Sequence, residues 1–100
     1  MELKNEFVDC KAIKEALEDN LPDAVKVISV WEGTMRNDNT YKVYVKVTQV
    51  DDSKESFFTE VVLGDMKAVI GELLDVEIID MTTLEFGFAL PLTSRYYLHK

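Results

Sequence analysis

The residue types that most often build catalytic and metal sites are scarce in this chain. Its 100 residues include a single cysteine, Cys10, and a single histidine, His99. One thiol cannot form an intramolecular disulfide, and one thiol with one imidazole cannot complete a zinc site. A histidine beside the C-terminus is poorly held as a catalytic base because chain ends fray. The sequence therefore predicts no catalytic residue, no metal site and no cofactor, and it favours a reducing, cytoplasmic setting.

Glycine and long apolar runs are also scarce. The four glycines stand apart from one another, so no glycine-rich loop is predicted to cradle a nucleotide phosphate. No apolar run approaches the roughly 18 residues of a membrane span. The first residues, Met-Glu-Leu-Lys-Asn-Glu, lack the basic start and apolar stretch of a signal peptide.

Positive charge is the third shortage. Eleven lysines and arginines stand against nineteen aspartates and glutamates, for a net charge of -8. A chain with this charge repels nucleic acid and anionic membranes, so we expect neither as a direct partner. Long-range attraction instead favours a basic protein, although the same charge also serves solubility alone.

Hydrophobic residues, by contrast, make up 47% of the chain. A chain of this length and composition buries an ordinary core without disulfides, so we expect residues 1–100 to form one domain. Apolar residues recur at three- and four-residue steps over residues 5–20, which predicts an amphipathic helix that ends before Pro22. The same spacing predicts a second helix over residues 66–74, with Asp65 as its N-cap.

Alternation of polar and apolar residues, or enrichment in β-branched residues, predicts the strands. The stretches that show it are 24–31, 40–50, 57–63, 76–81 and 84–90. Residues 40–50 and 57–63 are joined by six polar residues and predict a central hairpin. A long, mobile polar loop is predicted over residues 32–39, after the strand at 24–31. Whether the last two form one strand or two stays open. The pattern favours an α+β fold, an antiparallel sheet of four to five strands with two helices on one face, in the order α-β-β-β-α-β(-β).

An acidic stretch stands out in the second half of the chain. From Asp65 to Glu85 there are six acidic residues and one lysine. Carboxylates of this density can meet a basic groove and imitate a nucleic-acid backbone. The alternative is a solvated helix and edge strand whose charges prevent aggregation. The residues predicted to bind a partner, here and at the polar turn of the predicted hairpin, are Asp75, Glu77, Asp80, Glu85, Asp51, Asp52 and Glu55.

Two helices cover only one face of a sheet, so the other face is predicted to be open. An apolar set on such a face usually marks an interface, which predicts self-association as a homodimer or higher oligomer. The alternative is that residues 96–98 of the C-terminal tail fold back and cover it. The side chains predicted on this face are Ile28, Val30, Tyr44, Phe58 and Val62. Lys42 and Lys46, beside Glu60, are predicted to frame this set, and Trp31 is predicted on the helix side of its strand with Val25 and Val27.

These features favour a non-enzymatic protein-binding module, such as a small inhibitor, immunity or adaptor protein that docks a basic or nucleic-acid-binding protein. The alternative function is a phage-type structural subunit, a tail or head-tail connector component, whose sheet edges pair between copies to form a homo-oligomer. An enzyme ranks third, because nothing in the sequence marks two carboxylates as a buried acid-base pair.

Overall fold

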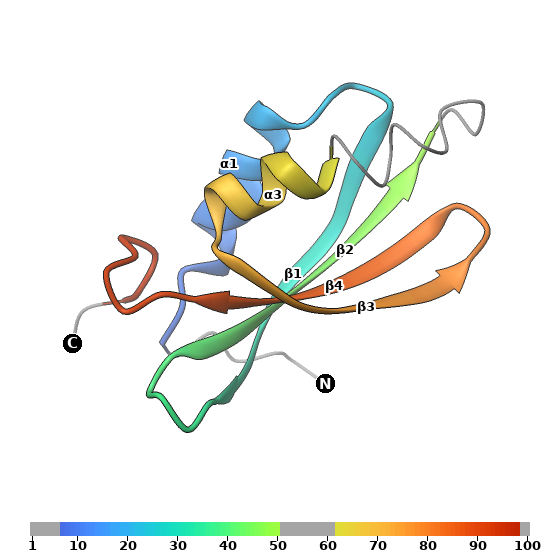
Figure 1. The fold of residues 1–100 in the computed structure, drawn as a ribbon. Coiled ribbons are helices and arrows are strands. Elements are labelled where there is room, and N and C mark those ends of the chain that lie inside the picture. Colours follow the sequence, from blue (N-terminus) through green and yellow to red (C-terminus); the bar gives the residue numbers. More distant parts are fainter. Residues whose placement is uncertain (1–6, 51–61, 99–100) are drawn as a thin grey trace.

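The computed structural model describes residues 7–50 and 62–98, which form an antiparallel sheet with two helices on one face (Figure 1). The strands lie in the order β1-β2-β4-β3, and each neighbouring pair is antiparallel. The predicted α+β fold, with an antiparallel sheet and two helices, is therefore confirmed. The elements are α1 (Cys10–Asn20), β1 (Val25–Met35), β2 (Tyr41–Gln49), α3 (Leu63–Val69), β3 (Glu72–Asp80) and β4 (Thr83–Leu90).

The first helix begins later than its apolar periodicity predicts. The Asp9 carboxylate accepts a hydrogen bond from the Ala12 amide at 3.1 Å and caps α1, because a side-chain oxygen can satisfy an amide that lacks a partner in the first turn. The residues just before the cap are not helical, and Val8 instead forms a β-bridge with Tyr97 near the end of the chain. The helix ends at Asn20, as predicted.

The predicted central hairpin is wrong, because β2 already has a strand on each side. β2 pairs with β1 along one edge and with β4 along the other. No edge of β2 is left for a strand over residues 57–63. Val62 is the N-cap of α3 and Leu63 is its first residue, while residues 51–61 lie outside the described residues.

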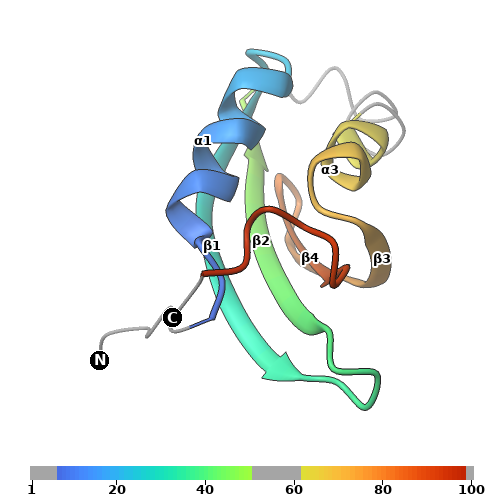
Figure 2. The same ribbon diagram turned by 90° about the vertical axis from the view of Figure 1, so that its left-hand side faces the viewer.

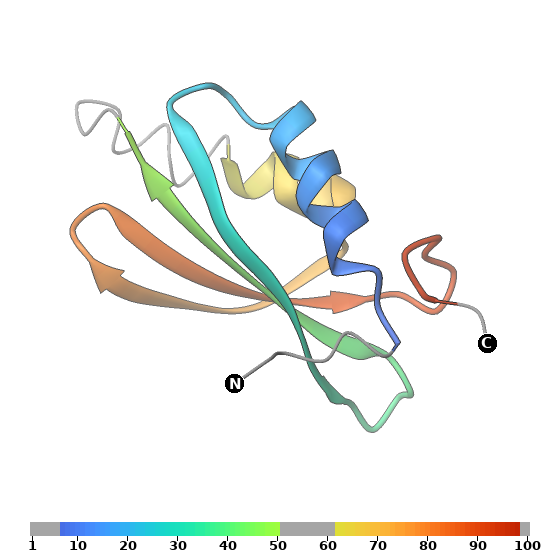
Figure 3. The ribbon, with the colours of Figure 1, turned by 180° about the vertical axis from the view of Figure 1, so that it is seen from behind.

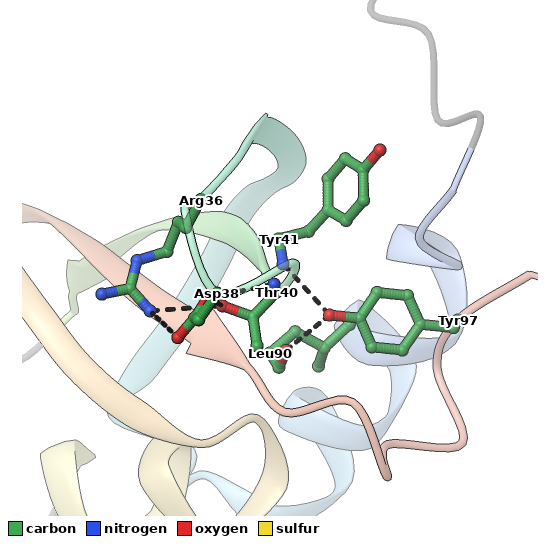
Figure 4. A network of polar contacts seen from close by, with 6 residues as sticks. All are labelled: Arg36, Asp38, Thr40, Tyr41, Leu90 and Tyr97. Atoms are coloured by element: carbon green, nitrogen blue, oxygen red, sulfur yellow. Dashed lines mark hydrogen bonds and ion pairs between the residues drawn. The ribbon is translucent and has the colours of Figure 1, made fainter.

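β1 runs on to Met35, so the first half of the expected mobile loop is strand and the connection to β2 is a tight polar turn (Figure 4). The Asp38 carboxylate accepts hydrogen bonds from the amide and the hydroxyl of Thr40, at 3.1 and 2.5 Å. Arg36 donates to both side chains at 3.2 Å. The Thr40 hydroxyl, followed by its amide, lowers the pKa of Asp38 because both bonds favour the charged form. Asn39 takes a left-handed backbone, with φ of 69°.

A bulge in β1 decides which of its side chains face the helices. The register against β2 skips Ile28, which lies between the paired residues Val27 and Ser29. An extra residue reverses the alternation of faces beyond it. Val30 therefore packs against the core and Trp31 lies on the opposite face. The prediction placed these two side chains the other way round and is wrong, since it assumed unbroken alternation.

α3 is shorter than predicted, and Asp65 lies in its first turn rather than at the N-cap. The chain reverses just after the helix at Gly71, which has a φ of 150°. A side chain at this position would collide with the main-chain oxygen of Ala89, so glycine is required there. The reversal places Leu73 and Leu74 in β3 instead of on the helix.

The last two predicted strands are separate, which settles the question that the sequence left open. β3 and β4 form a hairpin whose turn lies at Met81 and Thr82. The Asp80 carboxylate accepts hydrogen bonds from the amide and hydroxyl of Thr82, at 3.0 and 3.2 Å. The turn end of this hairpin projects beyond the two helices (Figures 1 and 3).

The core lies between the sheet and the two helices. It combines the buried stripe of α1 with alternate residues of β2 and β4 and with Met66 of α3, which is how two layers of secondary structure remove their apolar faces from water. The largest fully buried side chains are Phe88, Ile13, Leu17, Met66, Leu90, Val8, Val43, Val45, Val47 and Val62.

The C-terminal segment packs beside the start of α1, on the helix side of the sheet (Figure 2). The Tyr97 hydroxyl donates to the Leu90 carbonyl at 2.5 Å and accepts from the Tyr41 amide at 3.0 Å (Figure 4). Tyr96 is buried in the core. The alternative in which this tail covers the open face is therefore wrong.

Candidate functional site

The face of the sheet away from the helices carries charged side chains around an aromatic pair. Cross-strand pairing aligns these side chains over all four strands, because residues directly opposite one another share a face. In one row Tyr44 lies between Trp31 on one side and Gly87 on the other. The set, called the open face below, consists of Trp31, Lys42, Tyr44, Lys46, Asp75, Glu77, Glu85 and Gly87.

An aromatic pair forms the centre of the open face. The rings of Trp31 and Tyr44 are stacked, with centroids 5.4 Å apart and planes at 18°. The ammonium of Lys42 lies 4.9 Å from the Tyr44 ring centroid, within the range in which a cation is attracted by the face of an aromatic ring. The pair is therefore a flat, half-buried surface that already holds one cationic group.

An ion pair spans the open face where a side chain is missing. The Nζ atom of Lys42 lies 2.6 Å from Oδ2 of Asp75, and this hydrogen bond raises the pKa of Lys42. A Cβ at Gly87 would lie 2.5 Å from Oδ1 of Asp75 and 2.7 Å from Cε of Lys42. The glycine thus leaves the space in which the two charged side chains meet.

A hollow of about 400 Å³ lies between the aromatic pair and the β3–β4 hairpin. Glu77 and Glu85 line it and are cross-strand partners of one another. Like charges directly opposite on a sheet repel, and neither carboxylate forms an ion pair with another residue of the described chain. The hollow therefore holds negative charge that a cationic group from outside would neutralise.

The structure brings together part of the predicted acidic surface. Asp75, Glu77 and Glu85 all line this hollow. Asp80 is committed to the hairpin turn, where the Thr82 amide, followed by the Thr83 hydroxyl, lowers its pKa. The remaining predicted carboxylates, Asp51, Asp52 and Glu55, lie outside the described residues.

The predicted apolar self-association surface is not the one that the structure presents. Tyr44 lies on the open face, while Ile28 is the extra residue of the bulge and is exposed. Val30 packs against the core, and Val62 is fully buried at the start of α3, so the prediction that either lies on the open face is wrong. Phe58 lies outside the described residues.

Sequence reasoning missed Trp31 and Gly87 as members of the site, while it did predict Lys42 beside this face. Trp31 was assigned to the helix side because no local signal in the sequence marks the bulge at Ile28. Gly87 joins the site through pairing between β2 and β4, which are far apart in the chain. Only the position of Gly87 within an alternating strand hinted at a close approach of other groups.

A second, larger hollow of about 560 Å³ lies between α1, the end of α3 and the C-terminal segment. Small or apolar residues, such as Ala16 and Ile70, form much of its lining. Its cations are Lys67 and Arg95, and Arg95 is engaged with Tyr96, whose hydroxyl it contacts at 3.2 Å. No carboxylate lines this hollow, so no pair of opposite charges lies in it, and the open face is the stronger candidate.

Cys10 has no features of a nucleophile. Its side chain is buried, and burial, followed by the negative charges of Glu32 and Asp9, raises the pKa of the thiol to about 12. The reactive form of cysteine is the thiolate, which this environment suppresses. Glu32 is itself engaged, because its carboxylate accepts hydrogen bonds from the amides of Phe7 and Val8 at 2.8 and 2.9 Å.

Taken together, the fold and the open face define a small α+β domain with a charged, hollowed sheet surface. Within residues 7–50 and 62–98, no group of three histidine, cysteine, aspartate or glutamate side chains is placed to hold a metal ion. In the same part of the chain, every helix is too short or too polar to cross a membrane. Comparisons with protein-family models, with curated proteins and with solved structures found no match.

Proposed function

We propose that this protein is a non-enzymatic binding module that docks a basic partner protein on its open face. The observation that carries the proposal is the convergence of Asp75, Glu77 and Glu85 with the stacked pair Trp31 and Tyr44 around one hollow. Aromatic side chains supply buried area at an interface, and charges around them supply orientation and attraction.

The chemistry of the hollow fits a lysine or arginine side chain. A guanidinium or ammonium group entering between Glu77 and Glu85 relieves their repulsion, and its alkyl stem packs on the aromatic pair. The net charge of -8 speeds the encounter with a positively charged protein. Binding of this kind weakens as salt screens the charges.

A partner that itself binds nucleic acid fits best, since carboxylates in rows can replace phosphates in a basic groove. The protein would then act as a small inhibitor, immunity or adaptor protein in a reducing, cytoplasmic setting. Its acidic surface would compete with nucleic acid for the partner's groove.

The test uses charge reversal on the open face. Proteins captured by the wild-type chain at low salt and released at about 0.5 M salt are identified, and their affinities for purified variants are measured. Glu77→Lys with Glu85→Lys should weaken binding by at least about a hundredfold. The matched control, Glu15→Lys with Asp19→Lys on the exposed side of α1, makes the same change in net charge and should retain most of the affinity. Equal loss in both variants, or no loss in either, would contradict the proposal.

The second candidate is the phage-type structural subunit. It is favoured by the two edge strands, β1 and β3, each of which pairs with only one other strand among the described residues. Pairing of β1 of one copy with β3 of the next would build a ring. Sedimentation at increasing protein concentration tests it. A closed oligomer of defined size supports this function, and a monomer at millimolar concentration removes it.

A further inference from the structure

Strand β3 lies at one edge of the sheet and presents two chemically different faces. It pairs with β4, and no other strand of the described chain pairs with it. Asp75 and Glu77 lie on the open face, opposite Gly87 and Glu85 of β4. Val76, between these two residues, and Ile78, just after them, lie on the helix side of the sheet.

The helix-side row of β3 is apolar and exposed. Val76 and Ile78 lie opposite Phe86 and Leu84, residues that belong to the core or pack against it. They are nevertheless 47% and 75% exposed, because this end of the hairpin projects beyond the two helices (Figures 1 and 3). An edge strand with an exposed apolar row is a template for another strand unless charge guards it.

The charge on β3 disfavours pairing with the β3 strand of a second copy of this chain. If two β3 strands paired antiparallel, the carboxylates of Asp75 and Glu77 from both copies would share one face at adjacent positions. Like charges placed opposite one another on a sheet are destabilising. The same carboxylates favour a strand that carries positive charge on that face.

We propose that β3 accepts an extended segment of a basic partner as an added strand, in which lysine or arginine alternates with apolar residues. The basic side chains lie beside Asp75 and Glu77, and the apolar ones cover Val76 and Ile78. Main-chain hydrogen bonds to the free edge supply affinity, and the alternation supplies specificity. This inference rests on the proposed function, because it uses two of the same carboxylates, and it adds the mode of binding.

Synthetic peptides test the inference without altering the protein. The probe is a capped nine-residue peptide that alternates lysine and valine, and its binding to the full chain is followed by fluorescence anisotropy. Two further versions of the peptide carry N-methyl groups on every second amide. One is methylated at the odd-numbered positions and the other at the even-numbered positions. Only every second amide of an added strand points toward the edge that it joins. The peptide that is methylated on those amides should therefore bind at least about tenfold more weakly, and the other should bind as the unmethylated peptide does.

A variant pair locates the binding edge. Ile78→Lys places a positive charge in the apolar row and should weaken binding of the unmethylated peptide by at least about tenfold. The control is Leu92→Lys, at an apolar side chain that is 64% exposed and lies outside the sheet, and it should bind the peptide unchanged. Circular dichroism checks that both variants are folded.

The outcomes separate this inference from the proposed function. Equal binding of both N-methylated peptides and of a scrambled peptide, all released by salt, overturns strand addition and leaves docking on the open face intact. Absence of binding by the alternating peptide also overturns strand addition. The proposed function fails separately, if the captured partner binds the Glu77→Lys, Glu85→Lys variant as tightly as the wild type.

Discussion

Gly87 in β4 and Gly71, just before β3, should respond very differently to substitution by alanine. At Gly87 a Cβ would meet the ends of two side chains, Asp75 Oδ1 at 2.5 Å and Lys42 Cε at 2.7 Å. Both groups can move aside, and Gly87 does not have a positive φ. At Gly71 the φ is 150° and the collision is with the main-chain oxygen of Ala89, which cannot move without the strand.

The magnitudes follow from these contacts. Gly87→Ala separates Lys42 from Asp75, but the Asp75 side chain is 54% exposed, so loss of the ion pair costs at most about 1 kcal/mol. Alanine also lowers the conformational entropy of the unfolded chain, which stabilises the folded protein by about 0.4–1 kcal/mol. The free energy of unfolding should therefore change by less than about 1 kcal/mol. Gly71→Ala adds backbone strain of about 1–3 kcal/mol to the steric collision, with no compensating gain.

Urea titration of both variants measures the difference. We expect the Gly87→Ala midpoint to stay near that of the wild type and the Gly71→Ala midpoint to fall clearly. Proton-detected spectra of the lysine ammonium groups should show the pKa of Lys42 falling toward its ordinary value in Gly87→Ala, because the Asp75 hydrogen bond raises it. A Gly87→Ala protein as unstable as Gly71→Ala would refute the reasoning, since it would mean that the ion pair is rigidly held.

Two further predictions concern stability. The Cys10 pKa is raised to about 12, so the unfolded chain releases this proton first, and the stability that the protonated thiol contributes below about pH 9 should be lost as pH rises toward 12. Above pH 8, the free energy of unfolding of the wild type should fall relative to that of Cys10→Ala by up to about 1.4 kcal/mol per pH unit. A difference between the two proteins that does not change with pH would contradict this. Tyr97→Phe removes the hydroxyl that joins Leu90 to Tyr41, and should cost about 1–3 kcal/mol because a main-chain amide and carbonyl lose their partner. Hydrogen exchange at the Tyr41 amide should accelerate in that variant, and unchanged protection would show that the bond is not maintained in solution.

Local patterns predicted the elements whose neighbours are close in sequence. The spacing of Ile13 and Leu17 gave the buried stripe of α1, and Pro22 marked its end. Alternation over Val43, Val45 and Val47 correctly gave β2 and the side that faces the core. These patterns are legible because each reflects one repeating geometry, 3.6 residues in a helix or two in a strand.

The errors share one cause, which is that strand pairing is not local. The hairpin between residues 40–50 and 57–63 was the nearest available pairing, but β2 pairs instead with β1 and with β4. The assignment of Val30 and Trp31 to the wrong faces of β1 has the same origin, because the extra residue at Ile28 is recognised only from the pairing with β2. That single bulge moved Trp31 onto the open face and Val30 off it.

The sequence by itself determined the α+β class, the negative charge and the presence of an acidic stretch, because composition and short-range periodicity express these properties directly. Only the tertiary structure decided that Asp75, Glu77 and Glu85 share a hollow with the aromatic pair. It also decided that the Asp80 carboxylate instead accepts hydrogen bonds within the β3–β4 turn. The physical reason is that a sheet face is assembled from strands distant in the chain. Each register is set by the competition among all strands for hydrogen-bonding edges and for burial of their apolar rows.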